Sequence, residues 1–319
     1  MDAPRTLRRK CWLSLAGTVV VVGLVGLVLG GRRHEFATAL TSTPVSLLAA
    51  AVALQVIALL ARSEAWLISL RAAGARVDRR ILFRAAGAGS LAAVINGSLG
   101  VAARIASLRR AAPGSTPKLP ALLTAEVPII AVEIALAAIF SFTLVVPLGI
   151  PWWVPVIAVT LAGAAMFGLR RLSDARRTGL CAGLAVMRSP SGGRLIAFTL
   201  LAVCTQVLRS WMMLHAIGED VSMLDAMALL IAMFTLGQLP IGPSTGPAAA
   251  MLILGAHGVA SSAAAGVLLA VSGMLGSLLF ASWALLDRVI SARVARTARE
   301  VTGSAVAAVP GPALPAAAG

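Results

Sequence analysis

Hydrophobic residues divide the chain into eight apolar segments separated by short polar connections. Six of these segments are continuous, at residues 12–30, 45–61, 119–146, 154–169, 195–214 and 260–286. A helix of roughly 20 residues crosses the hydrocarbon core of a bilayer, which is about 30 Å thick. We therefore predict an all-α polytopic membrane protein with about six transmembrane spans.

The other two apolar segments, 81–106 and 223–256, are each interrupted by residues that break helices. The first break contains Asn96, Gly97, Ser98 and Gly100, and the second contains Pro240, Gly242, Pro243, Gly246 and Pro247. Proline lacks the backbone N–H that a helix needs, and glycine readily adopts non-helical dihedral angles. Unwound backbone at membrane depth must be buried in protein or line a wet cavity. We predict that each segment is a re-entrant helical hairpin with its break at the tip.

The distribution of arginine supports these hairpins and sets the expected orientation. Basic residues crowd the connections 62–84 and 109–118 on either side of the first interrupted segment. Positive charge favours the cytoplasmic side, where both connections can lie only if 81–106 turns back. With both hairpins, the N- and C-termini are cytoplasmic. Residues 1–11 then form a basic N-terminus, 12–288 the transmembrane domain, and 289–319 a basic and then disordered tail.

The two halves of this predicted topology match each other. Each half reads span, span, hairpin, span, and the halves have opposite orientations, which is the arrangement of an inverted repeat. The hairpin tips would then meet from opposite sides of the bilayer. An A-x-A pattern at 37–39 resembles a signal-peptide cleavage site, but the segment 12–30 is longer than a usual signal core, so we expect residues 1–39 to be retained.

Composition agrees with a membrane protein and argues against several other classes. Apolar residues make up 59% of the chain and charged residues 12%, with a mean hydropathy of +0.94. In soluble domains the apolar share is about 45–50% and the charged share about 25%. The net charge is +15, and the basic residues that produce it lie mostly between apolar segments. They therefore orient the chain in the membrane and do not predict nucleic-acid binding. The isolated cysteines and histidines predict no metal site and no cofactor. We interpret the tryptophans, which lie near segment ends, as interfacial anchors.

Four of the charged residues inside apolar segments are candidates for function. Glu126 and Glu133 lie seven residues apart, hence on one helix face about 10.5 Å apart along the axis. Arg104 and Arg209 could each offer a guanidinium fork to a phosphate. Either glutamate could pair with one of these arginines to hold helices together, or could handle substrate or protons. The alternative for Arg209 is that it reaches the outer interface beside Trp211.

The predicted hairpin tips carry further polar side chains. Asn96, Ser98, Ser244 and Thr245 could supply amide and hydroxyl contacts to a head group, and helices that start after the breaks would direct N–H groups at an anion. The alternative is that both tips are purely structural turns. Gln55, Gln206 and Gln238 are expected to form hydrogen bonds between helices.

Several of these residues together resemble a known family. They are Asn96 in a glycine-containing break followed by Arg104 and residues 108–110, then Glu126, and then a Pro-Gly break followed by residues 255–259. Over about residues 45–286 the chain resembles the transmembrane region of lysylphosphatidylglycerol synthases and their free-standing flippase-like relatives. The resemblance implies movement of a lipid between leaflets of the bacterial cytoplasmic membrane. Because the chain ends soon after its last span, we expect it to lack the soluble aminoacyl-transferring domain.

These inferences combine into one functional hypothesis with two alternatives. The head group of an anionic phospholipid or lipid-linked intermediate would pass a site between the tips, meeting Arg104 and Arg209, with Glu126 or Glu133 as countercharge or proton carrier. The alternatives are a secondary transporter of a small polar or anionic solute and a non-catalytic subunit that scaffolds a lipid-modifying enzyme. No catalytic motif is present, so we expect no enzyme; an embedded one would use the two glutamates as an acid–base pair. Expected partners are membrane lipid and either a second copy of the chain or a lipid-modifying enzyme.

Overall fold

The computed structural model describes residues 38, 43–95, 97–113, 118–175, 184, 186–187, 189–216, 221–236, 249–250, 252–253 and 259–307. These residues are helical or irregular and include no strand. Five stretches among them are long and apolar enough to cross a membrane: Val45–Ala72, Leu119–Leu148, Trp153–Ser173, Gly192–Ala216 and Ser262–Ser291. Each matches a predicted span, so the chain is a helical multi-pass membrane protein. The predicted span 12–30 and the second break lie outside the described residues.

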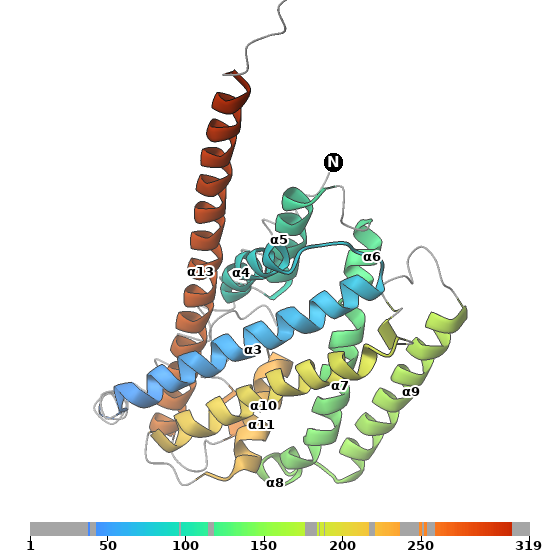
Figure 1. Ribbon diagram of the computed structural model, residues 1–319. Helices are drawn as coiled ribbons and strands as arrows, with labels where there is room; N and C mark the ends of the chain where they lie inside the picture. Colours follow the sequence, from blue (N-terminus) through green and yellow to red (C-terminus); the bar gives the residue numbers. More distant parts are fainter. Residues whose placement is uncertain are drawn as a thin grey trace, which may run out of the picture.

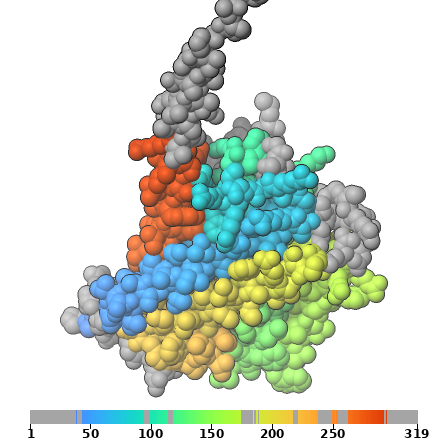
Figure 2. All heavy atoms as spheres, viewed as in Figure 1, coloured from blue at the N-terminus to red at the C-terminus, as the bar shows by residue number. Residues whose placement is uncertain are grey.

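Two long helices lie side by side across one face of the molecule. α3 (Val45–Ala72) and α10 (Gly192–Ala216) pack along each other and run in opposite directions, as Figures 1 and 2 show. α3 extends beyond the predicted end at 61 and ends in a Schellman motif. There Gly74, with φ +89°, donates to Arg71 O at 3.0 Å, and Ala75 donates to Leu70 O at 2.9 Å. A positive φ favours glycine, so Gly74, not the fall in hydropathy, sets the end of α3.

The first interrupted segment folds into two helices that pack against each other, α4 (Arg79–Ile95) and α5 (Gly97–Ala111). A Cβ added to Gly89 would lie 2.8 Å from Arg104 Cβ, and one added to Gly100 would lie 2.6 Å from Ala93 Cβ. Residues at similar distances on either side of Asn96 therefore face each other, as in a hairpin.

The break in this hairpin is shorter than predicted. Gly97, Ser98 and Gly100 belong to the first turn of α5 and not to an unwound tip. Asn96 itself lies outside the described residues. Gly100 instead allows α4 and α5 to approach closely, because any side chain there would collide with Ala93 and with Gly89 O.

The membrane-length stretch Leu119–Leu148 is made of four short helical elements that follow one another. It comprises α6 (Leu119–Thr124), α7 (Val127–Phe140), the 3₁₀ helix η1 (Ser141–Leu144) and α8 (Val145–Leu148). Pro128 has no N–H to donate to Thr124 O, so the helix is interrupted at Ala125 and Glu126. Gly149, with φ +61°, follows α8. The chain then returns through α9 (Trp153–Ala175).

The C-terminal part contains α11 (Met223–Leu236) and α13 (Val259–Ala307). A capping box starts α11, since Ser222 N donates to Asp225 Oδ2 at 3.0 Å and Asp225 N donates to Ser222 Oγ at 3.3 Å. α13 is 49 residues long and runs past the membrane-length stretch. The helix includes residues 303–307, which belong to the tail predicted to be disordered, because it continues from the run of alanine and arginine at 292–299.

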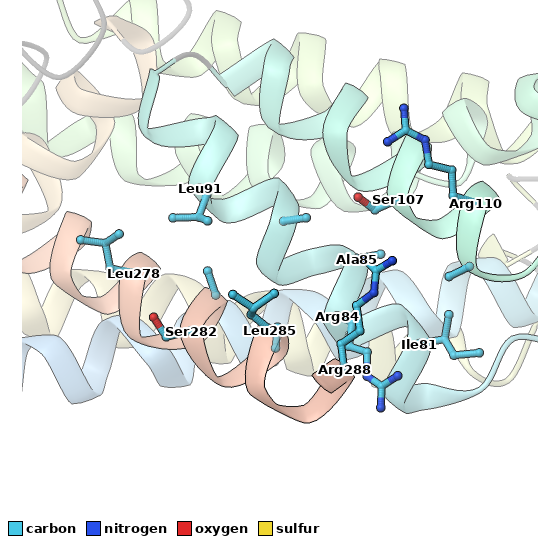
Figure 3. Close-up of a pocket in the computed structure, with 14 residues that line it drawn as sticks. Ile81, Arg84, Ala85, Leu91, Ser107, Arg110, Leu278, Ser282, Leu285 and Arg288 are labelled. Atoms are coloured by element: carbon cyan, nitrogen blue, oxygen red, sulfur yellow. The ribbon is translucent and has the colours of Figure 1, made fainter. Parts of the chain in front are cut away.

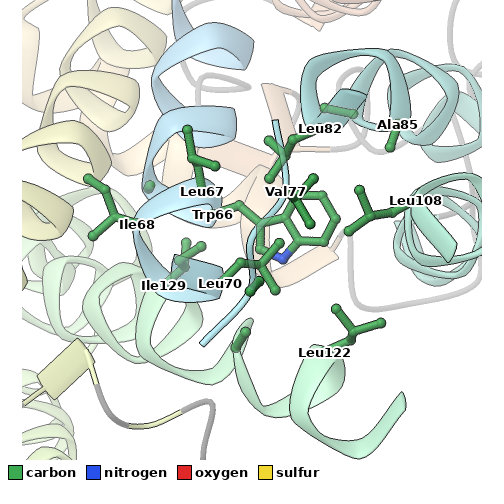
Figure 4. Packing of buried hydrophobic residues seen from close by; sticks show 14 of the residues in the cluster. Trp66, Leu67, Ile68, Leu70, Val77, Leu82, Ala85, Leu108, Leu122 and Ile129 are labelled. Atoms are coloured by element: carbon green, nitrogen blue, oxygen red, sulfur yellow. The ribbon is translucent and has the colours of Figure 1, made fainter. Parts of the chain in front are cut away.

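The interior divides into two hydrophobic clusters that share α3 and α10. One surrounds Trp66 and draws on α4, α5 and α7, as Figure 4 shows. The other surrounds Met213 and Leu229 and draws on α11 and α13. Two helices each pack against either α3 or α10 and against one further span: α4 packs on α3 and α13, and α11 packs on α10 and on α7 with η1.

Candidate functional site

A buried ion pair lies in the cluster around Trp66. Arg104 on α5 donates from Nη2 to Oε1 of Glu126, which lies at the junction of α6 and α7. Arg104 is 9% exposed and Glu126 5%. The guanidinium carbon of Arg104 also lies 4.2 Å from the ring centroid of Trp66, which is fully buried on α3. The cation is therefore held between a carboxylate and an aromatic face, two environments that each stabilise positive charge.

Not all hydrogen-bond donors at this pair are used. Arg104 Nε and Trp66 Nε1 are buried and have no acceptor among the described residues. Buried donors are normally paired, and leaving one unpaired costs about 1–3 kcal/mol. The site around Arg104 could therefore accept an additional oxygen ligand.

A second ion pair lies near the first and links α3 to α7. Arg62 Nη2 on α3 donates to Glu133 Oε2 on α7 at 3.0 Å. Arg62 precedes Trp66 by one helical turn, and Glu133 follows Glu126 by two. Arg62 is nearly half exposed, whereas Glu133 is mostly covered. Together the two pairs place two guanidinium groups and two carboxylates among α3, α5 and α7.

Arg209 forms a separate polar cluster where α10, α3 and α13 meet. Its Nη1 donates to Gln55 Oε1 at 2.7 Å, and Gln206 Nε2 donates to the same oxygen at 2.9 Å. The expectation that Gln55 and Gln206 bond between helices is confirmed. Space for this cluster comes from glycine on α13, because a Cβ on Gly273 would lie 3.0 Å from Arg209 Nη1.

Arg209 is a buried cation without a carboxylate partner in the described residues. It is 5% exposed, so the alternative that it extends to the interface beside Trp211 is wrong. No described Asp or Glu forms a salt bridge with it, and its Nε has no acceptor within the described chain. Within the part of the chain that the structure describes, its charge is met by a single amide oxygen, which is an incomplete environment for a guanidinium.

The structure brings together only some of the predicted site residues. Arg104 and Glu126 are in contact and Glu133 is close to them, whereas Arg209 is separate. Gln55 and Trp66 are eleven residues apart on α3, which places the two clusters about 16 Å apart along that helix. Ser98 lies in the first turn of α5, and its side chain is not among those described. The remaining predicted residues lie outside the described residues: Asn96, Pro240, Gly242, Pro243, Ser244, Thr245, Gly246 and Pro247.

Sequence reasoning missed two residues of the first cluster. The sequence predicts Trp66 as an interfacial anchor and places Arg62 in a basic connection, because the apolar run ends at 61. Both lie inside α3, and their spacing of four residues is a helical signal that could have placed them on one face.

The described residues contain no group of three or more His, Cys, Asp or Glu side chains that could hold a metal ion. The chemistry of the two clusters is that of guanidinium groups, carboxylates and amides, which suits recognition of an anion. Comparisons of the chain with protein-family models, curated proteins and solved structures find no match.

Proposed function

We propose that the protein moves a lipid, either an anionic phospholipid or a lipid-linked intermediate, between the leaflets of the bacterial cytoplasmic membrane. The observation that carries this proposal is Arg209. Among the described residues this buried cation meets only an amide oxygen, which is costly in a helix bundle, and such residues typically mark the path of a substrate or ion. An anionic head group would supply the missing charge.

Helix packing supports an inverted repeat around this site. When α3 is exchanged with α10, α4 with α11, and α7 with α13, the packed pairs α4·α13 and α3·α13 become α11·α7 and α10·α7, which are also packed. Such repeats in transporters enclose a substrate site between two equivalent halves. The hairpin α4–α5 would be the re-entrant element of the first half.

In the proposed mechanism, the phosphate of the head group is held in turn by the two buried arginines. At Arg104 it would replace Glu126 as the acceptor, and the released carboxylate would take a proton or stay as countercharge. At Arg209 it would add to Gln55. The aliphatic chains would stay in the bilayer, because only the polar head group has a desolvation cost to offset.

The test is leaflet exchange of a fluorescent phospholipid in proteoliposomes. We expect Arg209→Gln to slow exchange at least tenfold, because it removes the cation while keeping a polar, though shorter, side chain. The matched control is Arg171→Gln on α9, an arginine that stacks on Phe167 away from both clusters. Exchange at the wild-type rate in Arg209→Gln would remove this residue from the mechanism.

The proposed topology has its own test. In a variant without native cysteines, we expect cysteines introduced at Arg76 and Lys118, both exposed, to react with an impermeant reagent from the same side of the membrane. These positions precede α4 and follow α5. Labelling from opposite sides would exclude the re-entrant hairpin.

A further inference from the structure

A cavity of about 450 Å³ lies between α4, α5 and α13, and neither Arg104 nor Arg209 lines it. This volume falls within the range of about 300–1,000 Å³ that is usual for small-molecule sites. Leu91, Leu278 and Leu285 line it and are exposed, so its apolar wall is open to the surroundings of the helices. In a membrane protein, such a wall is accessible to lipid chains.

The two ends of the cavity differ in character. Figure 3 shows Arg84, Arg110 and Arg288 towards one end and Leu91 and Leu278 at the other. Each arginine comes from a different helix: the start of α4, the end of α5 and the later part of α13. Leu278 precedes Arg288 by ten residues, about 15 Å along the helix. The cavity is therefore amphipathic along its length.

The basic end carries more positive charge than its neighbours neutralise. Arg84 Nε donates to Asp287 Oδ2 at 2.6 Å, and Arg84 Nη2 donates to Ser291 Oγ at 2.6 Å. Within the described chain, no carboxylate lies at salt-bridge distance from Arg110 or Arg288. Asp287 can offset one of the three guanidinium charges, which leaves the end cationic.

We infer that this cavity binds an anionic phospholipid, with the phosphate on the arginines and the first part of a chain along the leucines. A guanidinium group can donate two parallel hydrogen bonds to the oxygens of one phosphate, and basic residues at a membrane surface attract anionic lipids. A free phosphate would leave the apolar wall unused. A zwitterionic lipid would place its own cation among three arginines, so net negative charge on the lipid is favoured.

This inference rests on the proposed function in one respect, because it takes the bound lipid to be the one that is moved. The cavity would then be where the lipid enters the protein from the leaflet on the side of the basic connections. α5 joins the cavity to the buried pair, since Arg110 and Arg104 are six residues apart, about 9 Å along the helix.

The experiment measures binding by native mass spectrometry of the purified full chain with equal amounts of phosphatidylglycerol and phosphatidylcholine. Arg110→Gln with Arg288→Gln leaves the Arg84–Asp287 pair intact, so the fold should be kept. Because one basic residue changes affinity for an anionic lipid about fivefold, we expect a loss of about 25-fold for phosphatidylglycerol. Ala88→Trp should also abolish this binding by filling the cavity without changing charge.

The control is Arg76→Gln with Arg109→Gln, which removes the same charge from exposed positions that do not line the cavity. We expect it to retain phosphatidylglycerol binding. Equal loss in the control, or unchanged binding in the cavity variants, would overturn the site. Competition by inorganic phosphate as effective as competition by short-chain phosphatidylglycerol would reduce it to a phosphate site and would also overturn the inference.

Leaflet exchange separates this inference from the proposed function. Slow exchange of labelled phosphatidylglycerol in the cavity variants would support both. Loss of binding with normal exchange would show that the lipid enters elsewhere, which overturns the role of the cavity as the entry point and leaves both the binding site and the proposed function. A wild-type protein that binds phosphatidylglycerol at the cavity but exchanges no lipid would overturn the proposed function, while the binding site would stand.

Discussion

Replacing Arg104 with methionine tests how much the buried ion pair contributes to the fold. The substitution removes the cation that contacts both Glu126 and the ring of Trp66. Methionine keeps a side chain of similar length against the indole. Glu126, however, would be left 5% exposed with no other hydrogen-bond partner among the described residues.

The expected cost follows from these contacts. Removing one partner of a buried ion pair typically costs about 3–5 kcal/mol, because the remaining charge stays buried. The lost cation–π contact is worth up to about 2 kcal/mol, and a methionine sulfur against the indole returns about 0.3–1.5 kcal/mol. We therefore expect Arg104→Met to lower the free energy of unfolding by about 3–5 kcal/mol.

The measurement is unfolding by SDS titration in mixed micelles, followed by far-ultraviolet circular dichroism. A double-mutant cycle with Glu126→Leu isolates the pair, and the double variant should be within about 1–2 kcal/mol of wild type, since apolar residues can replace a buried pair. The matched control is the cycle of Arg62→Gln and Glu133→Gln. Because Arg62 is 46% exposed, its coupling energy should be below about 1 kcal/mol.

Two results would refute this reasoning. One is a loss below about 1 kcal/mol in Arg104→Met, which would mean that Glu126 can reach water or a proton at little cost. The other is a double variant no more stable than the worse single variant, which would assign the loss to packing around Trp66 and not to charge.

Two further predictions use the same unfolding measurement. Gly100→Ala should cost about 1–3 kcal/mol, because its Cβ would lie 2.6 Å from Ala93 Cβ, whereas Gly163→Ala, with nothing described within 4 Å, should gain about 0.5–1 kcal/mol. Equal effects would exclude close packing in the hairpin. Gln55→Ala should cost about 1.5–3 kcal/mol, because Arg209 loses its acceptor, and Gln206→Ala only about 1 kcal/mol. A larger loss in Gln206→Ala would contradict this.

The predicted spans agree with the structure because the length of an apolar run is a direct requirement of the bilayer. The ends of helices were predicted less well. α3 continues through Arg62 to Ala72, and α13 continues through its arginines to Ala307. The end of a helix is set by backbone capping and by residues of low helix propensity, whereas hydropathy indicates only where the chain leaves the lipid. The hairpin at 81–106 was predictable because basic residues lie on both sides of it.

The candidate site could be predicted in its residue types but not in its pairing. Arg104, Arg209, Glu126 and Glu133 stand out in the sequence because charge inside an apolar run is costly. Which arginine meets which glutamate depends on how α5 and α10 lie against α7. The position of α5 is set in part by its close approach to α4, where Gly89 lies against Arg104, a tertiary feature without a pattern of its own in the chain.

The Gln55–Gln206 bond gives the proposed inverted repeat a specific consequence. If a twofold axis exchanges α3 and α10, residues that lie on the axis contact their own equivalents in the other half. Gln55 and Gln206, whose side chains are hydrogen-bonded at 2.9 Å, fit that position. Three residues further along each helix lie Arg209 and Ala58, both buried. Only one half therefore carries a cation at the crossing. A head group that moves between equivalent halves would meet Arg209 from one side alone, so the scaffold can be symmetric while the affinity for an anion differs between its two orientations.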